Sequence, residues 1–174
     1  MTNFNTSKTK ENLLKAFAGE SQARNRYTFS ASVAKKEGYP ILEDLFNYTA
    51  NQEKAHAKQF MDKLKEFSGE ELEITASYPV VVETSTLALL RLAEKHENNE
   101  FENVYHEFAS VAKEEGFPDI EKLFTNIASI EKVHSDRFKK YADMLEKGSL
   151  FKDLLVQLGC VLIADLFMKV KKHH

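Results

Sequence analysis

The 174-residue sequence contains a single cysteine, Cys160, which excludes both a disulfide framework and a four-thiolate metal site built from this chain. Its three prolines and six glycines are few, and the tracts between them are rich in Ala, Leu, Glu and Lys, which favours helices over strands. The net charge of −3 is small, so nothing indicates nucleic acid or an anionic membrane as a partner. With 43% hydrophobic and 29% charged residues, the composition is that of one globular domain.

The sequence also has little that indicates targeting to a membrane or export. Its start, MTNFNTSKTKENLL, has no basic region followed by an apolar run, as a secretory signal would. The apolar run near the other end is short and is interrupted by Gly159 and Asp165, so it does not read as a membrane span. We therefore expect a cytoplasmic protein with neither a membrane nor a nucleic acid as partner.

Turn residues divide the chain into four predicted helices. GYP at residues 38–40 and GFP at residues 116–118 each combine a glycine that ends one helix with a proline close to the start of the next. The connection EFSGEELEITASYPVVVETS is long for a loop between two helices and predicts a crossover that runs the length of a bundle. The predicted helices lie near residues 7–37, 40–67, 83–115 and 118–147.

The two halves of the chain repeat each other. A shift of 78 residues aligns residues 27–60 with residues 105–138 without a gap, and half of the aligned positions are identical. Each half is a helical hairpin, and two hairpins joined by a long crossover form a four-helix bundle with pseudo-twofold symmetry. The fold class is therefore predicted to be all-α, a ferritin-like four-helix bundle.

Acidic and imidazole side chains lie in line with the apolar stripe of each predicted helix. NQEKAHAKQF at residues 51–60 and SIEKVHSDRF at residues 129–138 each place a Glu and a His three residues apart, while the first helix carries one inward acid and the third carries two. A lone Glu-x-x-His on a charged helix is usually surface decoration, but two in register with a repeat are not. The seven candidates are Glu20, Glu53, His56, Glu97, Glu100, Glu131 and His134.

Buried carboxylates without partners are costly, and they normally take up a proton or bind a cation. Five carboxylates and two imidazoles nearly balance two divalent cations, and this thiolate-free set suits iron or manganese and leaves zinc possible. Ferritin-like di-iron proteins have this general arrangement. Tyr27 and Tyr105, which the repeat relates, are either core aromatics with a satisfied hydroxyl or hydrogen-bond donors to the carboxylates. The tracts KKEG and KEEG are predicted to be solvated surface.

Four runs, AFAGESQARNRYTFSASVAKKEGY, NQEKAHAKQF, EFASVAKEEGF and IEKVHSDRF, closely resemble the rubrerythrin family of non-haem di-iron peroxidases, over roughly residues 7–152. In that family a Glu-x-x-Glu pair on the third helix is followed, five residues after its second Glu, by a Tyr. The resemblance, together with the repeat, therefore selects Glu97 and Glu100 in AEKHENNEF, with Tyr105 five residues later, and leaves Glu94 outside the site. The implied iron ligands are Glu20, Glu53, His56, Glu97, Glu100, Glu131 and His134.

The resemblance implies an NADH-linked peroxidase that reduces hydrogen peroxide to water at two iron ions, in defence against oxidative stress. Glu53 and Glu131 are implied to bridge the irons, and Glu20 and Glu97 to be terminal ligands. Glu100 and His56 are implied to exchange on one iron, while His134 holds the other, and Tyr27 and Tyr105 hydrogen-bond the carboxylates. A rubredoxin-like or flavoprotein electron donor and a homodimer or homotetramer are expected. The alternatives are a ferroxidase or iron-handling ferritin-like protein, and a structural bundle without metal.

The last residues depart from the family, whose full-length members continue into a rubredoxin domain with four cysteines around one iron. Back-translation of GCVLIADLFMKVKKHH with freely chosen synonymous codons permits a Cys-x-x-Cys-Gly and a His-Glu-Gly in the neighbouring frame. We therefore predict a ferritin-like domain over residues 1–148 and an aberrant tail over 149–174, with a frameshift from about residue 154. The chain then has no rubredoxin-type iron site, and turnover needs an external electron donor.

Overall fold

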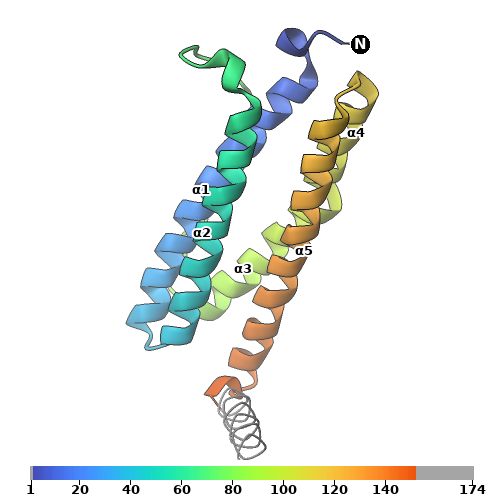
Figure 1. Cartoon of the computed structure of the whole chain (residues 1–174). Coiled ribbons are helices and arrows are strands. Elements are labelled where there is room, and N and C mark those ends of the chain that lie inside the picture. The colour runs from blue at the N-terminus through green and yellow to red at the C-terminus, as the bar shows by residue number, and fades with distance from the viewer. Residues whose placement is uncertain (1, 152–174) are drawn as a thin grey trace, which may run out of the picture.

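A computed structural model describes residues 2–151, and within them the chain is an all-α bundle of two helical hairpins (Figure 1). The first hairpin pairs α1 with α2, and the second pairs α5 with an element in which α3, a π-helical turn η3 and α4 follow one another without a break. The bounds are η1 (Phe4–Thr6), α1 (Lys8–Lys36), α2 (Pro40–Lys63), η2 (Lys65–Phe67), α3 (Thr86–Asn99), η3 (Glu100–Val104), α4 (Tyr105–Glu115) and α5 (Pro118–Glu146).

The helix boundaries agree with the predicted turn signals. Gly38 and Gly116 have φ of +80° and +88°, the left-handed conformation that glycine adopts without steric cost after a helix. Pro40 and Pro118 occupy the first positions of α2 and α5, where a missing N–H costs no hydrogen bond. The third helix begins at Thr86 rather than near residue 83, because the Ser85 side chain caps it by accepting a hydrogen bond from the N–H of Ala88. The predictions for the tail from about residue 154 concern residues outside those described.

The predicted crossover is present, and residues 68–85 contain neither helix nor strand. It connects the end of α2 to the start of α3 at the other end of the bundle (Figure 1). Tyr78 donates a hydrogen bond from its hydroxyl to the carbonyl of Lys15 in α1, at 2.8 Å. Val81 packs against the core, whereas its neighbours Val80 and Val82 are exposed. The crossover is therefore held against the first hairpin along its course.

Two glutamates connect the hairpins, and both belong to tracts that the sequence predicts to be solvated surface. Glu115, in KEEG, accepts hydrogen bonds from the N–H groups of Lys8 and Thr9 at 3.1 and 2.8 Å, and from the Thr9 hydroxyl. Glu37, in KKEG, accepts one from the N–H of Thr86 at 2.8 Å. The tract around Glu37 is exposed as predicted and Glu115 is half-buried, so these surface carboxylates have a structural role that the prediction did not include. Each carboxylate binds N–H groups in the first turn of a helix in the other hairpin, where such groups lack helical partners.

Replacing Glu115 with alanine is expected to lower the free energy of unfolding by about 1 to 2 kcal/mol, because two N–H groups and one hydroxyl lose their acceptor. Urea unfolding at pH 7 measures this, and Glu114→Ala, a change at an exposed neighbour, should have little effect. Partial burial raises the pKa of Glu115, but the hydrogen bonds from Thr9 and Lys8 outweigh it. The pKa of Glu115 is therefore below its ordinary value. The difference between wild type and variant should therefore shrink as the pH falls below about 4. An equal loss in both variants would contradict the capping role.

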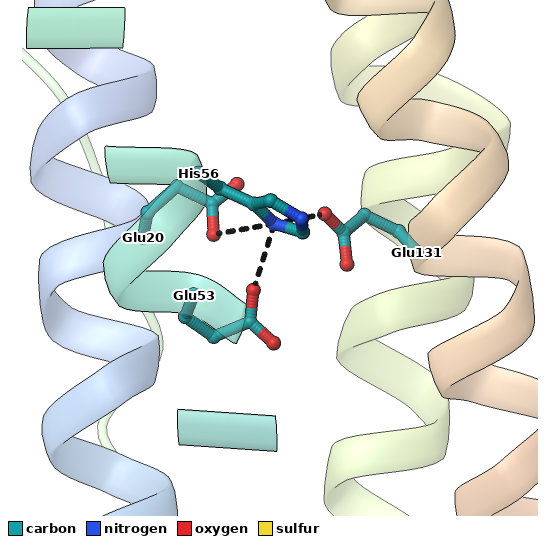
Figure 2. Close-up of side chains that lie close together, drawn as sticks. All are labelled: Glu20, Glu53, His56 and Glu131. Carbon is teal, nitrogen blue, oxygen red and sulfur yellow. Dashed lines mark ion pairs between the residues drawn. The ribbon is translucent and has the colours of Figure 1, made fainter. Parts of the chain in front are cut away.

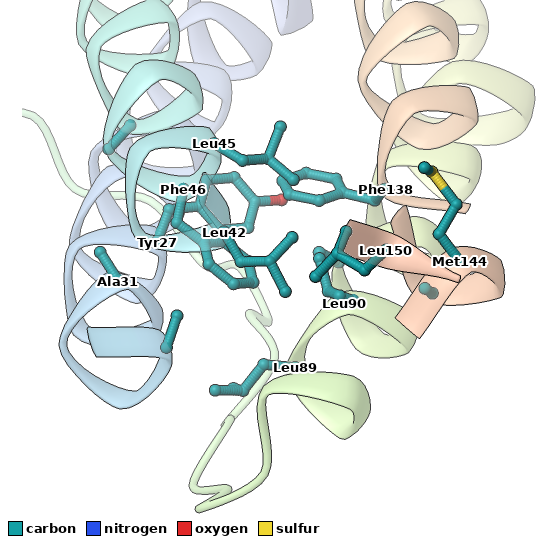
Figure 3. Packing of buried hydrophobic residues seen from close by; sticks show 14 of the residues in the cluster. Tyr27, Ala31, Leu42, Leu45, Phe46, Leu89, Leu90, Phe138, Met144 and Leu150 are labelled. Carbon is teal, nitrogen blue, oxygen red and sulfur yellow. The ribbon is translucent and has the colours of Figure 1, made fainter. Parts of the chain in front are cut away.

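The apolar core consists of two clusters that the internal repeat relates. In one, the rings of Tyr27 and Phe46 lie against Phe138, with centroid distances of 5.1 and 5.5 Å to that ring (Figure 3). In the other, Tyr105 and Phe124 surround Phe60 in the same way, at 5.7 and 5.3 Å. Along each of the four helical elements, the inward acids and imidazoles are preceded by residues of one cluster and followed by residues of the other. Apolar packing therefore lies above and below the site along the bundle axis.

No helix within residues 2–151 is long and apolar enough to cross a membrane.

Candidate metal centre

Two groups of buried side chains converge between the hairpins, and each contains one histidine and three glutamates. The first group brings Glu20 from α1 together with residues of α2 and α5 (Figure 2). The second brings Glu97 from α3 together with residues of the same two helices. Within each group the candidate ligand atoms lie within 4.8 Å of one another. The groups are Glu20, Glu53, His56 and Glu131, and Glu53, Glu97, Glu131 and His134.

Glu53 and Glu131 belong to both groups, and each directs one oxygen toward each imidazole. Glu53 Oε2 lies 3.1 Å from Nδ1 of His56, and its Oε1 lies 3.1 Å from Nδ1 of His134. Glu131 Oε1 lies 2.9 Å from Nδ1 of His56, and its Oε2 lies 2.7 Å from Nδ1 of His134. Glu20 and Glu97 each approach one imidazole only, at 3.6 and 3.3 Å. The site thus has two halves that share two carboxylates.

The two terminal carboxylates are held by tyrosines from the opposite hairpin. Tyr27 of α1 donates its hydroxyl hydrogen bond to Oε1 of Glu97, and Tyr105 of α4 donates to Oε1 of Glu20. Both rings are almost fully buried. Of the two roles considered for these tyrosines, the structure shows both at once, since each ring packs in the core and each hydroxyl reaches a carboxylate.

The π-helical turn η3 explains a discrepancy in the repeat. Glu20 precedes Tyr27 by seven residues, whereas Glu97 precedes Tyr105 by eight. One turn of π-helix takes in one residue more than an α-helical turn, and η3 lies between Glu97 and Tyr105. The extra residue therefore leaves both carboxylates facing the centre, although they are one position apart in the aligned sequences.

Glu100 is the one predicted ligand that lies in neither group of converging atoms. It is the first residue of η3 and is half-buried. Burial, and after it the carboxylates of Glu97 and Glu20, raise the pKa of Glu100 well above its ordinary value. Burial, and after it the carboxylates of Glu20 and Glu100, also raise the pKa of Tyr105. Glu100 lines the same cavity as Tyr105, whose hydroxyl donates to Glu20 in the first group.

A cavity of about 590 Å³ opens beside Glu100, between α1, the crossover and the third helix. Its walls combine carboxylate, imidazole and hydroxyl groups with apolar side chains. They include Lys15, Ala16, Gly19, Tyr78, His96, Asn99, Glu100, Val104, Tyr105 and Phe108.

The unpartnered atoms of the site match what a pair of cations requires. Among the described residues, no hydrogen-bond partner reaches Oε2 of Glu20, either oxygen of Glu53 or Glu131, or Nδ1 of His56. Three carboxylates approach that single nitrogen, which carries one hydrogen at most, so hydrogen bonding alone does not satisfy them. Buried oxygens and nitrogens converging on shared points are the donor set that iron or manganese prefers.

The pKa values show how strongly the centre attracts positive charge. Despite burial, the close carboxylates, that of Glu131 first, raise the pKa of His56 and of His134 to about 12. Burial raises the pKa of Glu20 well above its ordinary value and that of Glu97 to about 8. The pKa of Glu131 falls to about 2, because the two imidazoles outweigh its burial. A cation that binds here takes the place of protons.

The family model for rubrerythrin matches residues 11–142 of this chain. The chain belongs to the rubrerythrin family. The rubrerythrin of Clostridium perfringens is 48% identical over 153 residues, which are 87% of this chain and 78% of that protein. A structure of fully reduced, all-ferrous nigerythrin has a TM-score of 0.70 and 29% identity, covering 84% of this chain and 75% of that one. A Desulfovibrio desulfuricans bacterioferritin, studied for its diiron site, has a TM-score of 0.73 and 25% identity, with 82% of each chain covered.

These likenesses confirm the predicted ferritin-like bundle, and they place this rubrerythrin-family chain among di-iron proteins whose buried Glu and His cluster can bind metal. The structure brings together six of the seven predicted ligands, all except Glu100. It also separates Glu94 from them, because the Glu94 carboxylate pairs with Arg91 and Lys139 at 2.9 and 3.8 Å.

One residue of this rubrerythrin-family site was missed by sequence reasoning. Gln52 lies immediately before Glu53, and its Oε1 is 3.2 Å from Nε2 of His134. The same oxygen accepts a hydrogen bond from Nη1 of Arg137 at 3.1 Å. The only sequence feature that could have indicated Gln52 is its position next to the predicted ligand Glu53. Polar residues are common at such positions on exposed helix faces, so this feature does not single it out.

Proposed function

We propose that this chain is a rubrerythrin-type peroxidase that reduces hydrogen peroxide to water at a di-iron centre. The observation that carries the proposal is the sharing of Glu53 and Glu131, each of which presents one oxygen to each imidazole. When bound as a ferrous pair, iron supplies the two electrons that, with two protons, convert one hydrogen peroxide into two water molecules. Membership of the rubrerythrin family supports iron as the metal.

Each side chain has a proposed role that follows from its place. Glu53 and Glu131 would bridge the two irons, and Glu20 and Glu97 would each bind one of them, as their contacts with a single imidazole suggest. His56 and His134 would bind through Nδ1, the nitrogen that faces the carboxylates. The seven-residue ligand set, including Glu100, remains a proposal.

Tyr27 and Tyr105 would orient the terminal carboxylates. Each donates to one oxygen, Oε1, and leaves Oε2 directed at the imidazole side of the site. A carboxylate held in this way keeps its orientation when the charge of the centre changes. The two hydroxyls also hold a proton at Oε1 of each terminal carboxylate.

Glu100 and His56 are the proposed exchange pair. Glu100 begins the π-helical turn and lines the same cavity as Tyr105, which donates to Glu20 in the group that contains His56. The cavity beside Glu100 is large enough for small oxidants and reaches Tyr105, so we propose it as the route of peroxide to the centre. Because Glu100 already lines this cavity, its carboxylate would need only to change its side-chain conformation to replace His56 as a ligand of one iron.

Stopped-flow absorbance of the reduced, iron-loaded chain tests this function. Peroxide is expected to reoxidise the ferrous centre faster than dioxygen does, when the two oxidants are supplied at equal concentration. Rapid oxidation by dioxygen with slow oxidation by peroxide would contradict a peroxidase. Steady turnover with NADH is expected only when a rubredoxin-like or flavoprotein donor returns electrons to the centre. The cytoplasmic setting and a dimer or tetramer remain predictions.

Ferroxidase activity with iron handling is the second candidate function, favoured by the similarity to a bacterioferritin studied for its diiron site. It uses the same two halves of the site, but iron would be substrate and would leave the centre after oxidation. Repeated additions of ferrous iron with dioxygen distinguish the two. Iron accumulating far beyond two ions per chain in a large assembly, seen by size exclusion with iron analysis, would support the ferroxidase.

A further inference from the structure

The two imidazoles of the centre are held differently, although the internal repeat relates them. His134 has no exposed side-chain surface, and both of its ring nitrogens have partners. Its Nδ1 faces the carboxylates, and its Nε2 lies 3.2 Å from Oε1 of Gln52. His134 is thus fixed from two sides.

Arg137 fixes the orientation of the Gln52 amide and, through it, the position of the hydrogen on the His134 ring. A guanidinium group has only donors, so the Gln52 amide atom 3.1 Å from Nη1 of Arg137 must be the oxygen. That same oxygen can accept from His134 only if Nε2 carries the hydrogen. The Nδ1 nitrogen then keeps its lone pair for a metal. The ring of Tyr48, 5.2 Å from the guanidinium carbon, holds Arg137 in place.

His56 has no corresponding arrangement. The shift of 78 residues that relates the halves aligns Gln52 with Ile130 and Arg137 with Gln59. Ile130 has no hydrogen-bonding side chain, and Gln59 is exposed. Within residues 2–151, no group hydrogen-bonds to Nε2 of His56, and 5% of its side chain is exposed. This imidazole is held only by its contacts with the carboxylates.

We propose that Gln52 is a positioning residue that keeps His134 on its iron, and that Ile130, by offering no acceptor, leaves His56 free to exchange. Gln52 has this role only if the di-iron function proposed above holds. The difference between the two imidazoles then results from the hydrogen bond that Gln52 makes to His134 and that Ile130 cannot make to His56. Of two imidazoles with similar carboxylate surroundings, the one without an outer hydrogen bond is released, and its group contains Glu20, which is bound by Tyr105 beside Glu100 in the cavity wall.

Ferrous iron binding to the full chain tests the role of Gln52. Gln52→Leu removes the acceptor while keeping a similar volume, and Gln52→Glu keeps an oxygen in its place. Competition with a chromophoric ferrous chelator is expected to show one of two irons bound about tenfold or more weakly in Gln52→Leu, and both bound as in wild type in Gln52→Glu. One of the two ferrous Mössbauer signals should change in Gln52→Leu alone.

The results distinguish failure of the di-iron function from failure of the role of Gln52 alone. If wild type does not take up two irons, the proposed function fails and the role of Gln52 fails with it. If wild type binds two irons and Gln52→Leu gives unchanged affinities and spectra, only the role of Gln52 is overturned. Equal effects of the Leu and Glu variants would also overturn it, because they would reflect packing rather than the hydrogen bond.

Ile130→Gln tests the other half, with Ile130→Leu as its control. Crystal structures of the ferrous and ferric forms are expected to show His56 bound in both states in Ile130→Gln, whereas wild type and Ile130→Leu lose the His56 contact in one of them. An Ile130→Gln protein whose His56 exchanges as in wild type would overturn the assignment to the missing acceptor.

Discussion

Replacing either Glu53 or Glu131 with alanine is expected to reduce bound iron from about two ions per chain to fewer than one. Each of these carboxylates contacts both imidazoles, so its loss removes a ligand from both halves of the centre. The remaining groups would also have to hold two cations with one negative charge fewer, at a buried site where charge balance is costly to disturb. Iron analysis of the purified, reconstituted variants measures the effect.

Glu94→Ala is the matched control for both variants. It removes a carboxylate from the same helix as Glu97, yet Glu94 pairs with Arg91 and Lys139 away from the centre. We expect this variant to keep about two irons per chain, since surface ion pairs contribute little. Unchanged iron in Glu53→Ala and Glu131→Ala, or a loss in Glu94→Ala equal to theirs, would contradict the bridging assignment.

Removing the metal is expected to lower the melting temperature by about 8 to 16 °C. A ligand at about 1,000 times its Kd stabilises the folded state by about 4 kcal/mol. In a domain of this size each kcal/mol shifts the melting temperature by about 2 to 4 °C. Differential scanning calorimetry of the iron-loaded chain, before and after treatment with a ferrous chelator, measures the shift, and adding iron back should restore it.

The same experiment addresses the reading in which this is a structural bundle without metal. A bundle of that kind would melt at the same temperature with and without chelator. Glu53→Ala provides the internal control, because its melting temperature should hardly respond to chelator once the centre no longer binds two irons. A wild-type protein that is insensitive to chelator would contradict metal binding as a source of stability.

The bundle could be predicted because its signals are local and repeated. Gly38 and Gly116 sit where a left-handed residue ends a helix, and the prolines after them fit only the start of the next. The repeat then indicated two similar hairpins, and the alignment of acids with apolar stripes placed the candidate ligands inside. These features depend on helical periodicity, which the sequence displays directly.

Other features could not be predicted, because they depend on where the two hairpins meet. The capping carboxylates Glu37 and Glu115 lie in charged tracts that look like surface, and their partners are 49 and 106 residues away. Gln52 reaches His134 across the bundle, from a position that the sequence does not distinguish. The π-helical turn η3 appeared in the sequence only as a one-residue mismatch in the repeat, and the mismatch alone does not reveal its cause.

The most direct test of the shared-carboxylate centre is a crystal structure of the ferrous-loaded chain with anomalous scattering measured at the iron edge. We expect two iron peaks, one beside Nδ1 of His56 and one beside Nδ1 of His134, with Glu53 and Glu131 each in contact with both. A single peak, or iron bound away from the two imidazoles, would contradict the di-iron centre.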